Sequence, residues 1–202
     1  WATARSILFI VVALLAAFEF GARSVGPSAS LSARARMQDR VFNLSANVDG
    51  LQGQIDFQKM QIERLERIHA YSSRYGIGAD LAASIEDIAL SERIDPKVAF
   101  ELVRVESEFN QRAVSPVGAL GYTQLMPETA RRLKPGITRS QIFDRETNLR
   151  LGFRFLRILI DQYRGHVHMA LLPYNRGPGR VDGLVRAGIN PDNGYSRMIL
   201  GR

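Results

Sequence analysis

One glutamate near the middle of the chain lies where a catalytic acid could work. Residues 95–109 read DPKVAFELVRVESEF, and the opening Asp-Pro pair is typical of a helix start. On a helical wheel Glu106 falls between Leu102 and Ala99, inside the apolar arc. Burial disfavours a charged carboxylate and raises its pKa, which suits a general acid at neutral pH. Glu106 is therefore the catalytic candidate.

The surroundings of Glu106 leave one structural alternative open. The other two glutamates of this segment, Glu101 and Glu108, fall on the polar face with Arg104, so Glu106 alone is expected to point inward. An inward glutamate can also serve as the partner of a buried arginine, such as one from residues 150–157. The sequence places no second carboxylate opposite Glu106, although glycosidases normally use a pair.

Two glycine-containing segments could supply groups that bind a ligand. The first, SPVGALGYTQLMP at 115–127, is a loop that leads into a helix and could bring Gln124 to a sugar. The second, YNRGPG at 174–179, ends one helix and begins another, so Tyr174 and Asn175 would project from a helix end. Both segments can equally be read as ordinary turns with helix caps.

Four motifs in order resemble the soluble-lytic-transglycosylase (SLT) family, which is related to the goose-type lysozymes. They are ELVRVESEFN, SPVGALGYTQLMP, NLRLG at 148–152 and PYNRGPGRV at 173–181, within a region of roughly 80–200. The resemblance implies a lysozyme-like fold and cleavage of the MurNAc–GlcNAc β-1,4 bond of peptidoglycan without water. It also implies that one glutamate acts first as acid and then as base on the C6 hydroxyl, which closes a 1,6-anhydro ring. No cofactor and no metal are implied.

The resemblance assigns expected roles residue by residue. Glu106 matches the catalytic acid and base, and Ser107 beside it is expected to be structural. The residues expected to contact the glycan are Ser115, Gln124, Met126, Tyr174, Asn175 and Tyr195, with Met126 packing on the sugar and Tyr174 hydrogen-bonding near Glu106.

The chain departs from the family pattern at three places. Tyr122 and Thr123 replace a Leu-Met pair, Pro173 replaces an alanine, and Arg176 stands where alanine is frequent. Pro173 is expected to end or kink its helix. The departures bear on the shape of the sugar subsites.

The chain is expected to be all-α and to have three parts. Residues 1–22 contain the apolar run ILFIVVALLAAF, which is shorter than the roughly 20 residues of a spanning helix. We interpret this part as an uncleaved signal anchor, with a cleaved signal peptide as the alternative. Residues 23–75 form a linker and helical spacer. Residues 76–202 form the lysozyme-like domain, with helices expected at 81–90, 127–133, 147–163, 167–175, 178–187 and 195–200 besides the helix that carries Glu106.

The spacer carries a heptad pattern. Its apolar positions are Val41, Val48, Ile55 and Ile62 at one heptad position and Leu44, Leu51 and Leu65 at the other. The pattern predicts a coiled coil that associates with another copy, or an amphipathic helix that lies on the following domain. Gly50 and Gly53 weaken either helix.

Composition narrows the remaining functions. The 202 residues contain no cysteine, which excludes disulfide scaffolds and thiol nucleophiles, and the three histidines do not suggest a metal site. The net charge of +7 comes from arginines spread among acidic residues, so nucleic acid is the least favoured partner. Peptidoglycan strands and a membrane contacted through the N-terminal segment fit better. The expected location is the periplasmic side of the inner membrane, or outside the cell.

Arginines are more numerous after the apolar run than before it, and positive charge usually stays on the cytoplasmic side of a membrane. This charge pattern alone would keep the rest of the chain in the cytoplasm. The expected substrate lies outside the cytoplasm, and we let it decide the location. Two rival functions remain open. One is a goose-type lysozyme-like hydrolase, and the other is a non-catalytic peptidoglycan-binding assembly module.

Overall fold

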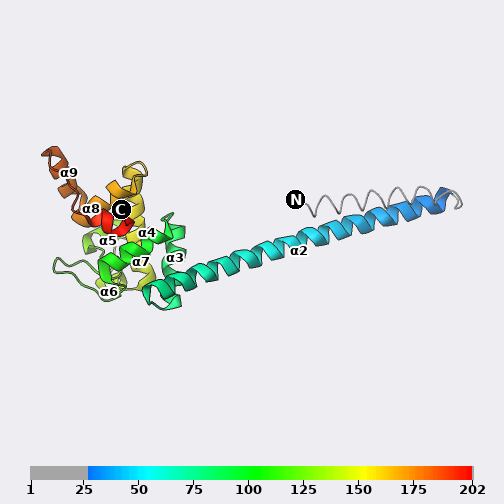
Figure 1. Ribbon diagram of the computed structural model, residues 1–202, viewed down its shortest axis with the longest axis horizontal. Helices are drawn as coiled ribbons and strands as arrows, with labels where there is room; N and C mark the ends of the chain where they lie inside the picture. The colour runs from blue at the N-terminus through cyan, green and yellow to red at the C-terminus, as the bar shows by residue number, and fades with distance from the viewer. Residues whose placement is uncertain (1–26, 202) are drawn as a thin grey trace. The chain divides into compact units, whose positions relative to one another are not determined.

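The computed structural model describes residues 27–201, which are helical apart from loops and two isolated β-bridges within residues 114–125 (Figure 1). The helices are α2 (Pro27–Tyr75), α3 (Ala79–Ser91), α4 (Pro96–Ser107), α5 (Pro127–Leu133), α6 (Arg139–Ile142), α7 (Arg145–Gln162), α8 (Val167–Arg176), α9 (Pro178–Arg186) and α10 (Tyr195–Leu200). The expected all-α class is confirmed. The chain divides into two compact units between Glu63 and Arg64.

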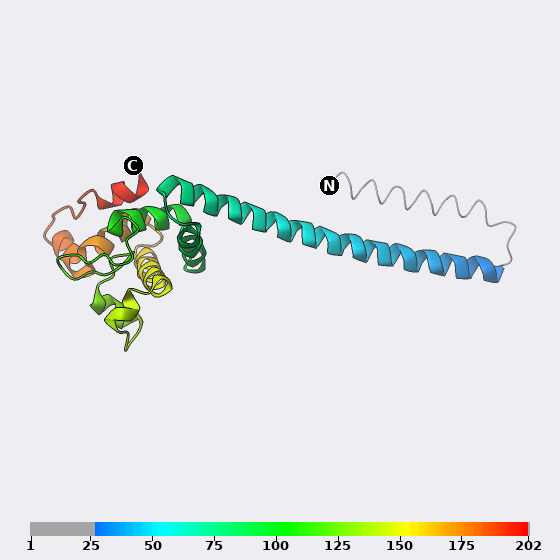
Figure 2. The same cartoon turned by 90° about the horizontal axis from the view of Figure 1, so that it is seen from below.

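The helix that carries Glu106 contributes to the main core of the second unit. The side chain of Asp95 accepts a hydrogen bond from the backbone N–H of Lys97, so it caps α4 as the sequence predicts. Phe100 and Leu102 are fully buried in the main core. α4 packs against α3 and α10, while α7 packs against α3 and α8, and these helices surround one apolar interior (Figure 2).

The last turns of α2 pack against the same unit. The ring of Tyr71 stacks on Phe100 with centroids 4.0 Å apart, and the Tyr75 hydroxyl donates to Glu101 Oε1 at 2.8 Å. Arg67 Nε donates to Oε1 of the fully buried Glu86 at 2.7 Å. Residues 64–75 are thus part of the compact unit that holds Glu106.

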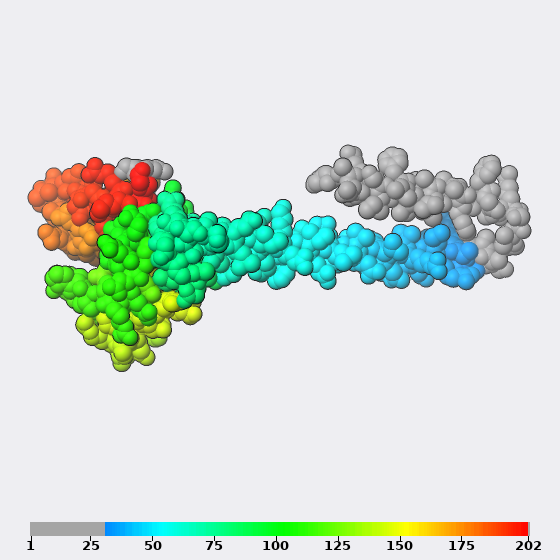
Figure 3. Space-filling view, turned by 60° about the horizontal axis from the view of Figure 1, so that its bottom comes forward, coloured from blue at the N-terminus to red at the C-terminus, as the bar shows by residue number. Residues whose placement is uncertain are grey.

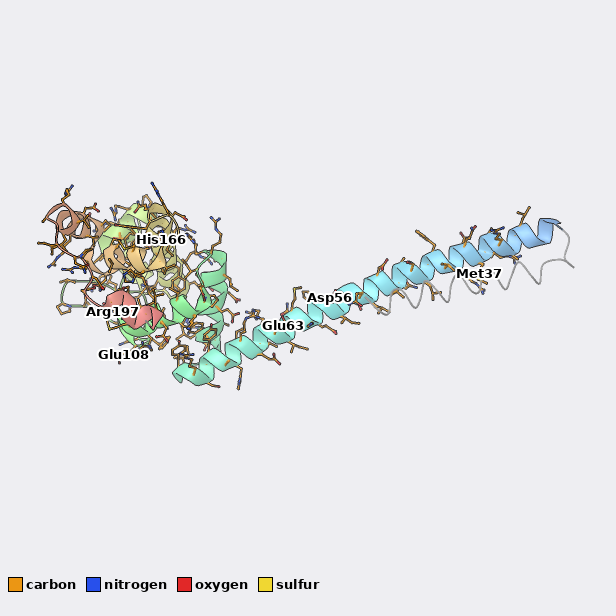
Figure 4. All side chains as sticks on the ribbon, turned by 45° about the horizontal axis from the view of Figure 1, so that its top comes forward. Met37, Asp56, Glu63, Glu108, His166 and Arg197 are labelled. Atoms are coloured by element: carbon orange, nitrogen blue, oxygen red, sulfur yellow. The ribbon has the colours of Figure 1, made fainter. Side chains whose placement is uncertain are left out.

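The earlier part of α2 presents apolar side chains to solvent. We call the seven heptad residues the heptad stripe: Val41, Leu44, Val48, Leu51, Ile55, Ile62 and Leu65, each between 37% and 66% exposed. Side chains such as Met37, Asp56 and Glu63 also project from this helix (Figure 4). The spacer is helical as expected, whereas its pairing with another copy stays a prediction.

No helix within residues 27–201 combines the length and apolar character needed to cross a membrane. The apolar run at 7–18, interpreted above as an anchor or signal peptide, lies outside the described residues.

Pro173 does not end its helix. α8 continues through Pro173 to Arg176 and stops at Gly177, whose φ is 81°. A proline removes one backbone donor, but the N–H of Gly177 still bonds to the Pro173 carbonyl at 2.9 Å and closes the last turn. Of the two effects expected of Pro173, an end of the helix is not observed, and a kink stays a prediction.

Asn148, at the start of α7, fixes the loop that precedes α5. Its Oδ1 accepts from the backbone N–H of Thr123, and its Nδ2 donates to the carbonyls of Leu120 and Ile142, each at 2.9 Å. Gly152, one turn later, lets the same loop approach, because a Cβ there would come within 2.3 Å of Thr123 Oγ1.

We expect Gly152→Ala to lower the free energy of unfolding by about 1–3 kcal/mol, because Thr123 is fully buried and cannot give way. Chemical denaturation of the full chain measures this. Gly183→Ala on α9 is the matched control, since a Cβ there meets nothing within 4 Å. Equal stability of the two variants would contradict the close packing of α7 on the loop.

Candidate active site

Glu106 lies at the C-terminal end of α4, half-buried, and its carboxylate meets a hydroxyl from the far end of the chain. The Tyr195 hydroxyl, on α10, donates to Glu106 Oε1. Burial raises the pKa of Glu106 to about 7, and the hydrogen bond from Tyr195 opposes that rise because it favours the carboxylate. The pair places a carboxyl group that titrates near neutrality at the surface between α4 and α10.

A second glutamate on α4 is also covered, which the wheel did not show. The side chain of Glu101 is only 12% exposed, and it accepts from Arg104 Nε at 2.7 Å as well as from Tyr75. Glu101 lies on the polar face of α4 as expected, but Tyr75 at the end of α2 covers it there. Glu108 is exposed, as expected (Figure 4).

The arginines of α7 do not serve as the partner of Glu106. Arg154 pairs with Glu92 at 2.7 Å, and Arg157 pairs with Asp161 at 2.7 Å. The partner of Glu106 in the described structure is the Tyr195 hydroxyl. The alternative that Glu106 neutralises a buried arginine therefore has no support from these contacts.

Tyr174 lies near Glu106 but bonds to the loop. Its hydroxyl donates to the Thr123 carbonyl at 3.0 Å, and its ring packs on Phe155 with centroids 5.4 Å apart. Burial and the charge of Glu106 both raise the pKa of the Tyr174 hydroxyl, so it stays protonated. Figure 3 shows the C-terminal region, in orange and red, against the green segment that contains the end of α4 and this loop.

Ser107 joins α4 to the same loop. Its hydroxyl donates to the Tyr122 carbonyl at 2.8 Å, one residue before the carbonyl that Tyr174 uses. This hydrogen bond supports the expectation that Ser107 has a structural role.

A cleft of about 590 Å³ opens beside Tyr174. Its lining residues are Val117, Gln124, Leu125, Met126, Thr129, Phe155, Pro173, Tyr174, Asn175, Arg176, Gly177, Pro178, Arg180 and Asn193. Four of the expected glycan contacts, Gln124, Met126, Tyr174 and Asn175, thus come together here. Glu106 is not part of this lining, whereas Tyr174, whose pKa is raised by burial and by the charge of Glu106, is.

Two expected contact residues are engaged in loop structure. The Ser115 hydroxyl accepts from the backbone N–H of Ala119 at 3.0 Å and closes the turn that carries Val117. The Gln124 amide donates to the Gly121 carbonyl at 3.0 Å, with its own backbone at a φ of 46°. Ser115 does not line the cleft, whereas Gln124 does.

Sequence reasoning missed Asn193, Phe155 and Arg180 as cleft residues. The amide of Asn193 donates to Asn175 Oδ1 at 2.9 Å, across a separation of 18 residues. Asn193 lies in the sequence NPDNG at 190–194, whose residue types are typical of a turn, but a turn signal does not show which way the loop runs. Arg180 belongs to the PYNRGPGRV motif, but no role was assigned to it from the sequence.

Comparison with known proteins identifies a similar domain. The family model described as the Transglycosylase SLT domain matches residues 83–188. The chain is 35% identical over 96 residues to the soluble lytic murein transglycosylase of Escherichia coli strain K12, covering 45% of this chain and 15% of that protein. It is 35% identical over 107 residues to the membrane-bound lytic murein transglycosylase C of Edwardsiella ictaluri, covering 45% and 30%.

A solved structure resembles the fold as well. The 70 kDa soluble lytic transglycosylase of Escherichia coli superposes with a TM-score of 0.53 and 28% sequence identity, covering 64% of this chain and 24% of that one. The chain thus spans less than a third of the length of each of these relatives.

The variant Tyr195→Phe keeps the aromatic ring but removes the hydroxyl that donates to Glu106. Because this hydrogen bond favours the carboxylate, we expect the pKa of Glu106 to rise from about 7 to a higher value. Titration of the Glu106 carboxyl carbon by ¹³C NMR measures the shift. Tyr163→Phe serves as the control, since its hydroxyl is not among the causes that act on Glu106. A lower pKa in Tyr195→Phe would contradict the role given to this hydrogen bond.

Proposed function

The chain belongs to the SLT transglycosylase family, and from this premise we propose that it is a peptidoglycan lytic transglycosylase in which Glu106 is the acid and base. The observation that carries the proposal is the raised pKa of the Glu106 carboxyl group. Its pKa is raised to about 7 by burial, and within the described residues no second carboxylate contributes to that shift. A single carboxyl group that gains and loses a proton near neutrality suits a reaction whose nucleophile comes from the substrate.

The proposed reaction moves one proton in each direction. Protonated Glu106 donates to the glycosidic oxygen, and the bond from that oxygen to C1 of MurNAc breaks, which leaves a free hydroxyl on GlcNAc. The Glu106 carboxylate then accepts the proton of the C6 hydroxyl of the same MurNAc while O6 bonds to C1. The product is a 1,6-anhydro ring, and no water is consumed. An attack within one sugar gains from proximity, which reduces the need for a second protein carboxylate.

Tyr195 fits the stage of this cycle at which Glu106 is ionised. Its donated hydrogen bond stabilises the carboxylate that forms after the first proton leaves, so it limits how far burial raises the pKa of Glu106. The position of Tyr174 supports a part in shaping the site, because its hydroxyl is committed to the loop carbonyl of Thr123.

The substrate argues for a location in the cell envelope. Peptidoglycan lies outside the cytoplasm, so we place the catalytic unit on the periplasmic side of the inner membrane or outside the cell. The Edwardsiella ictaluri relative is named as a membrane-bound enzyme, which agrees with such a location.

The residue types of the heptad stripe favour pairing with a second copy of this chain. Valine and isoleucine occupy one heptad position and leucine the other, a combination that favours a coiled coil of two parallel helices. Gln58 occupies a leucine position of the same heptad pattern but is polar, so the apolar stripe is interrupted there. The flanking pairs in a parallel, in-register dimer would be Arg40 with Ser45, Asn47 with Gln52, Gln54 with Lys59 and Gln61 with Glu66. None of these pairs brings like charges together.

We expect Glu106→Gln to reduce cleavage of purified sacculi at least about 100-fold, because the amide can neither donate nor accept the transferred proton. The wild-type chain should release muropeptides that end in 1,6-anhydro-MurNAc, read by mass spectrometry. Its activity should fall as the pH rises past about 7, where the acid loses its proton. Reducing-end products would instead support the lysozyme-like hydrolase, and full activity of the variant would support a non-catalytic module.

We expect Ile55→Lys to convert a dimer of the full chain into a monomer, because it puts a charge in the centre of the heptad stripe. Phe57→Lys is the matched control: Phe57 is 57% exposed and Ile55 is 56% exposed, but Phe57 lies off the stripe. Sedimentation equilibrium gives the mass of each. Dimers in both variants, or a monomeric wild type, would overturn the pairing.

A further inference from the structure

We propose that the cleft beside Tyr174 contains a carboxylate-binding subsite formed by Arg176 and Arg180. The inference rests on the proposed function and extends it: the enzyme would recognise a negatively charged group carried by the glycan, besides the sugars themselves. The chemical class of the ligand is a carboxylate attached to, or near, a MurNAc residue.

The charge of the cleft carries the proposal. Of the residues that line it, Arg176 and Arg180 are the only charged ones, and the rest are apolar or neutral polar. A concave site with two positive groups and no acidic residue in its lining attracts anions. Guanidinium groups bind carboxylates through paired N–H donors, so the lining suits this ligand class.

The two guanidinium groups lack carboxylate partners within residues 27–201. Arginines elsewhere in the catalytic unit do have them, as Arg145 does with Asp80 and Arg154 does with Glu92, each at 2.7 Å. Arg176 and Arg180 form no ion pair with any described residue. Their positive charge is therefore available to a ligand.

Arg176 is held in place by the backbone. Its NH1 donates to the Pro191 carbonyl at 3.0 Å, and the side chain is half-buried. A neutral acceptor fixes the direction of the guanidinium without cancelling its charge. Arg176 also stands where the family frequently has alanine, so this half of the subsite would distinguish this chain from its relatives.

Arg180 supplies the second, more exposed half. It lies in the first turns of α9, which begins at Pro178 directly after the segment that holds Asn175 and Arg176. The Asn193 and Asn175 amides, joined at 2.9 Å, line the cleft with the arginines. Amides can bond to the acetamido and peptide groups that neighbour a carboxylate in peptidoglycan.

Peptidoglycan offers this carboxylate from two sources. A MurNAc residue without a peptide exposes its own lactyl carboxylate, whereas a MurNAc residue with a stem peptide carries the carboxylates of that peptide. A neutral chitin oligosaccharide has neither. Peptide-bearing glycan, peptide-free glycan and chitin oligosaccharide therefore form a useful comparison. The chitin oligosaccharide tests whether the carboxylate matters, and the two glycans test which carboxylate is bound.

The experiment measures binding by the full chain with Glu106→Gln, so that no ligand is cleaved. Dissociation constants are compared for peptide-bearing glycan strands, amidase-stripped glycan strands and chitohexaose. The added changes are Arg180→Gln alone, Arg176→Gln with Arg180→Gln, and Arg186→Gln as the control, since Arg186 is exposed on α9 but does not line the cleft.

We expect the double arginine change to weaken binding of at least one carboxylate-bearing glycan about tenfold or more, with chitohexaose and the Arg186 control unchanged. Arg180→Gln alone should give part of this loss. Loss with peptide-bearing strands alone assigns the stem carboxylates, and loss with stripped strands alone assigns the lactyl group. Equal loss for chitohexaose, or no loss for either charged glycan, would overturn the subsite.

Failure of this subsite and failure of the proposed reaction can be told apart. Binding is read in chains that already carry Glu106→Gln, while the reaction is read from the products of the wild-type chain. A wild-type chain that releases no anhydro product would sink the reaction, whatever the arginine variants bind.

Discussion

The loop 120–125 is held by hydrogen bonds from three helices, and the geometry of the site depends on it. Asn148 on α7 bonds to Leu120 and Thr123 of the loop. Ser107 on α4 donates to the Tyr122 carbonyl, and Tyr174 on α8 donates to the Thr123 carbonyl. α4, which carries Glu106, and α8, which ends in the cleft, are therefore fixed against neighbouring backbone carbonyls of one loop. Neutral, buried hydrogen bonds of this kind set direction without adding charge near Glu106.

Much of the fold could be predicted from local signals. Apolar periodicity and the Asp-Pro start placed α4 and Glu106 correctly, because both are properties of a dozen consecutive residues. The partner of Glu106 could not be derived in this way, since Tyr195 lies 89 residues away. The resemblance gave Tyr195 as a glycan contact and expected Tyr174 to hydrogen-bond near Glu106, whereas Tyr174 donates to Thr123. The cover over Glu101 was missed for the same reason: Tyr75 comes from another helix.

The residues of the cleft also fall into those that the sequence predicted and those that it did not. The segments that carry Gln124 and Tyr174 were recognised as motifs, and the structure brings both into one wall. Asn193 had no motif to mark it, and its place follows from a turn whose path is set by tertiary contacts. Charge balance within the cleft is likewise a tertiary property, because arginines that look alike in the sequence differ in whether a carboxylate reaches them.

The half-buried carboxyl of Glu106 also has a thermodynamic consequence for the folded state. Its pKa is raised from an ordinary value of 4.5 to about 7, so between these values the folded chain holds a proton that the unfolded chain has released. By linkage, this one group makes folding less favourable as the pH rises through that window, and the loss is complete above it. The residue best suited to donate a proton thus opposes the fold at alkaline pH, and the hydrogen bond from Tyr195 reduces that opposition.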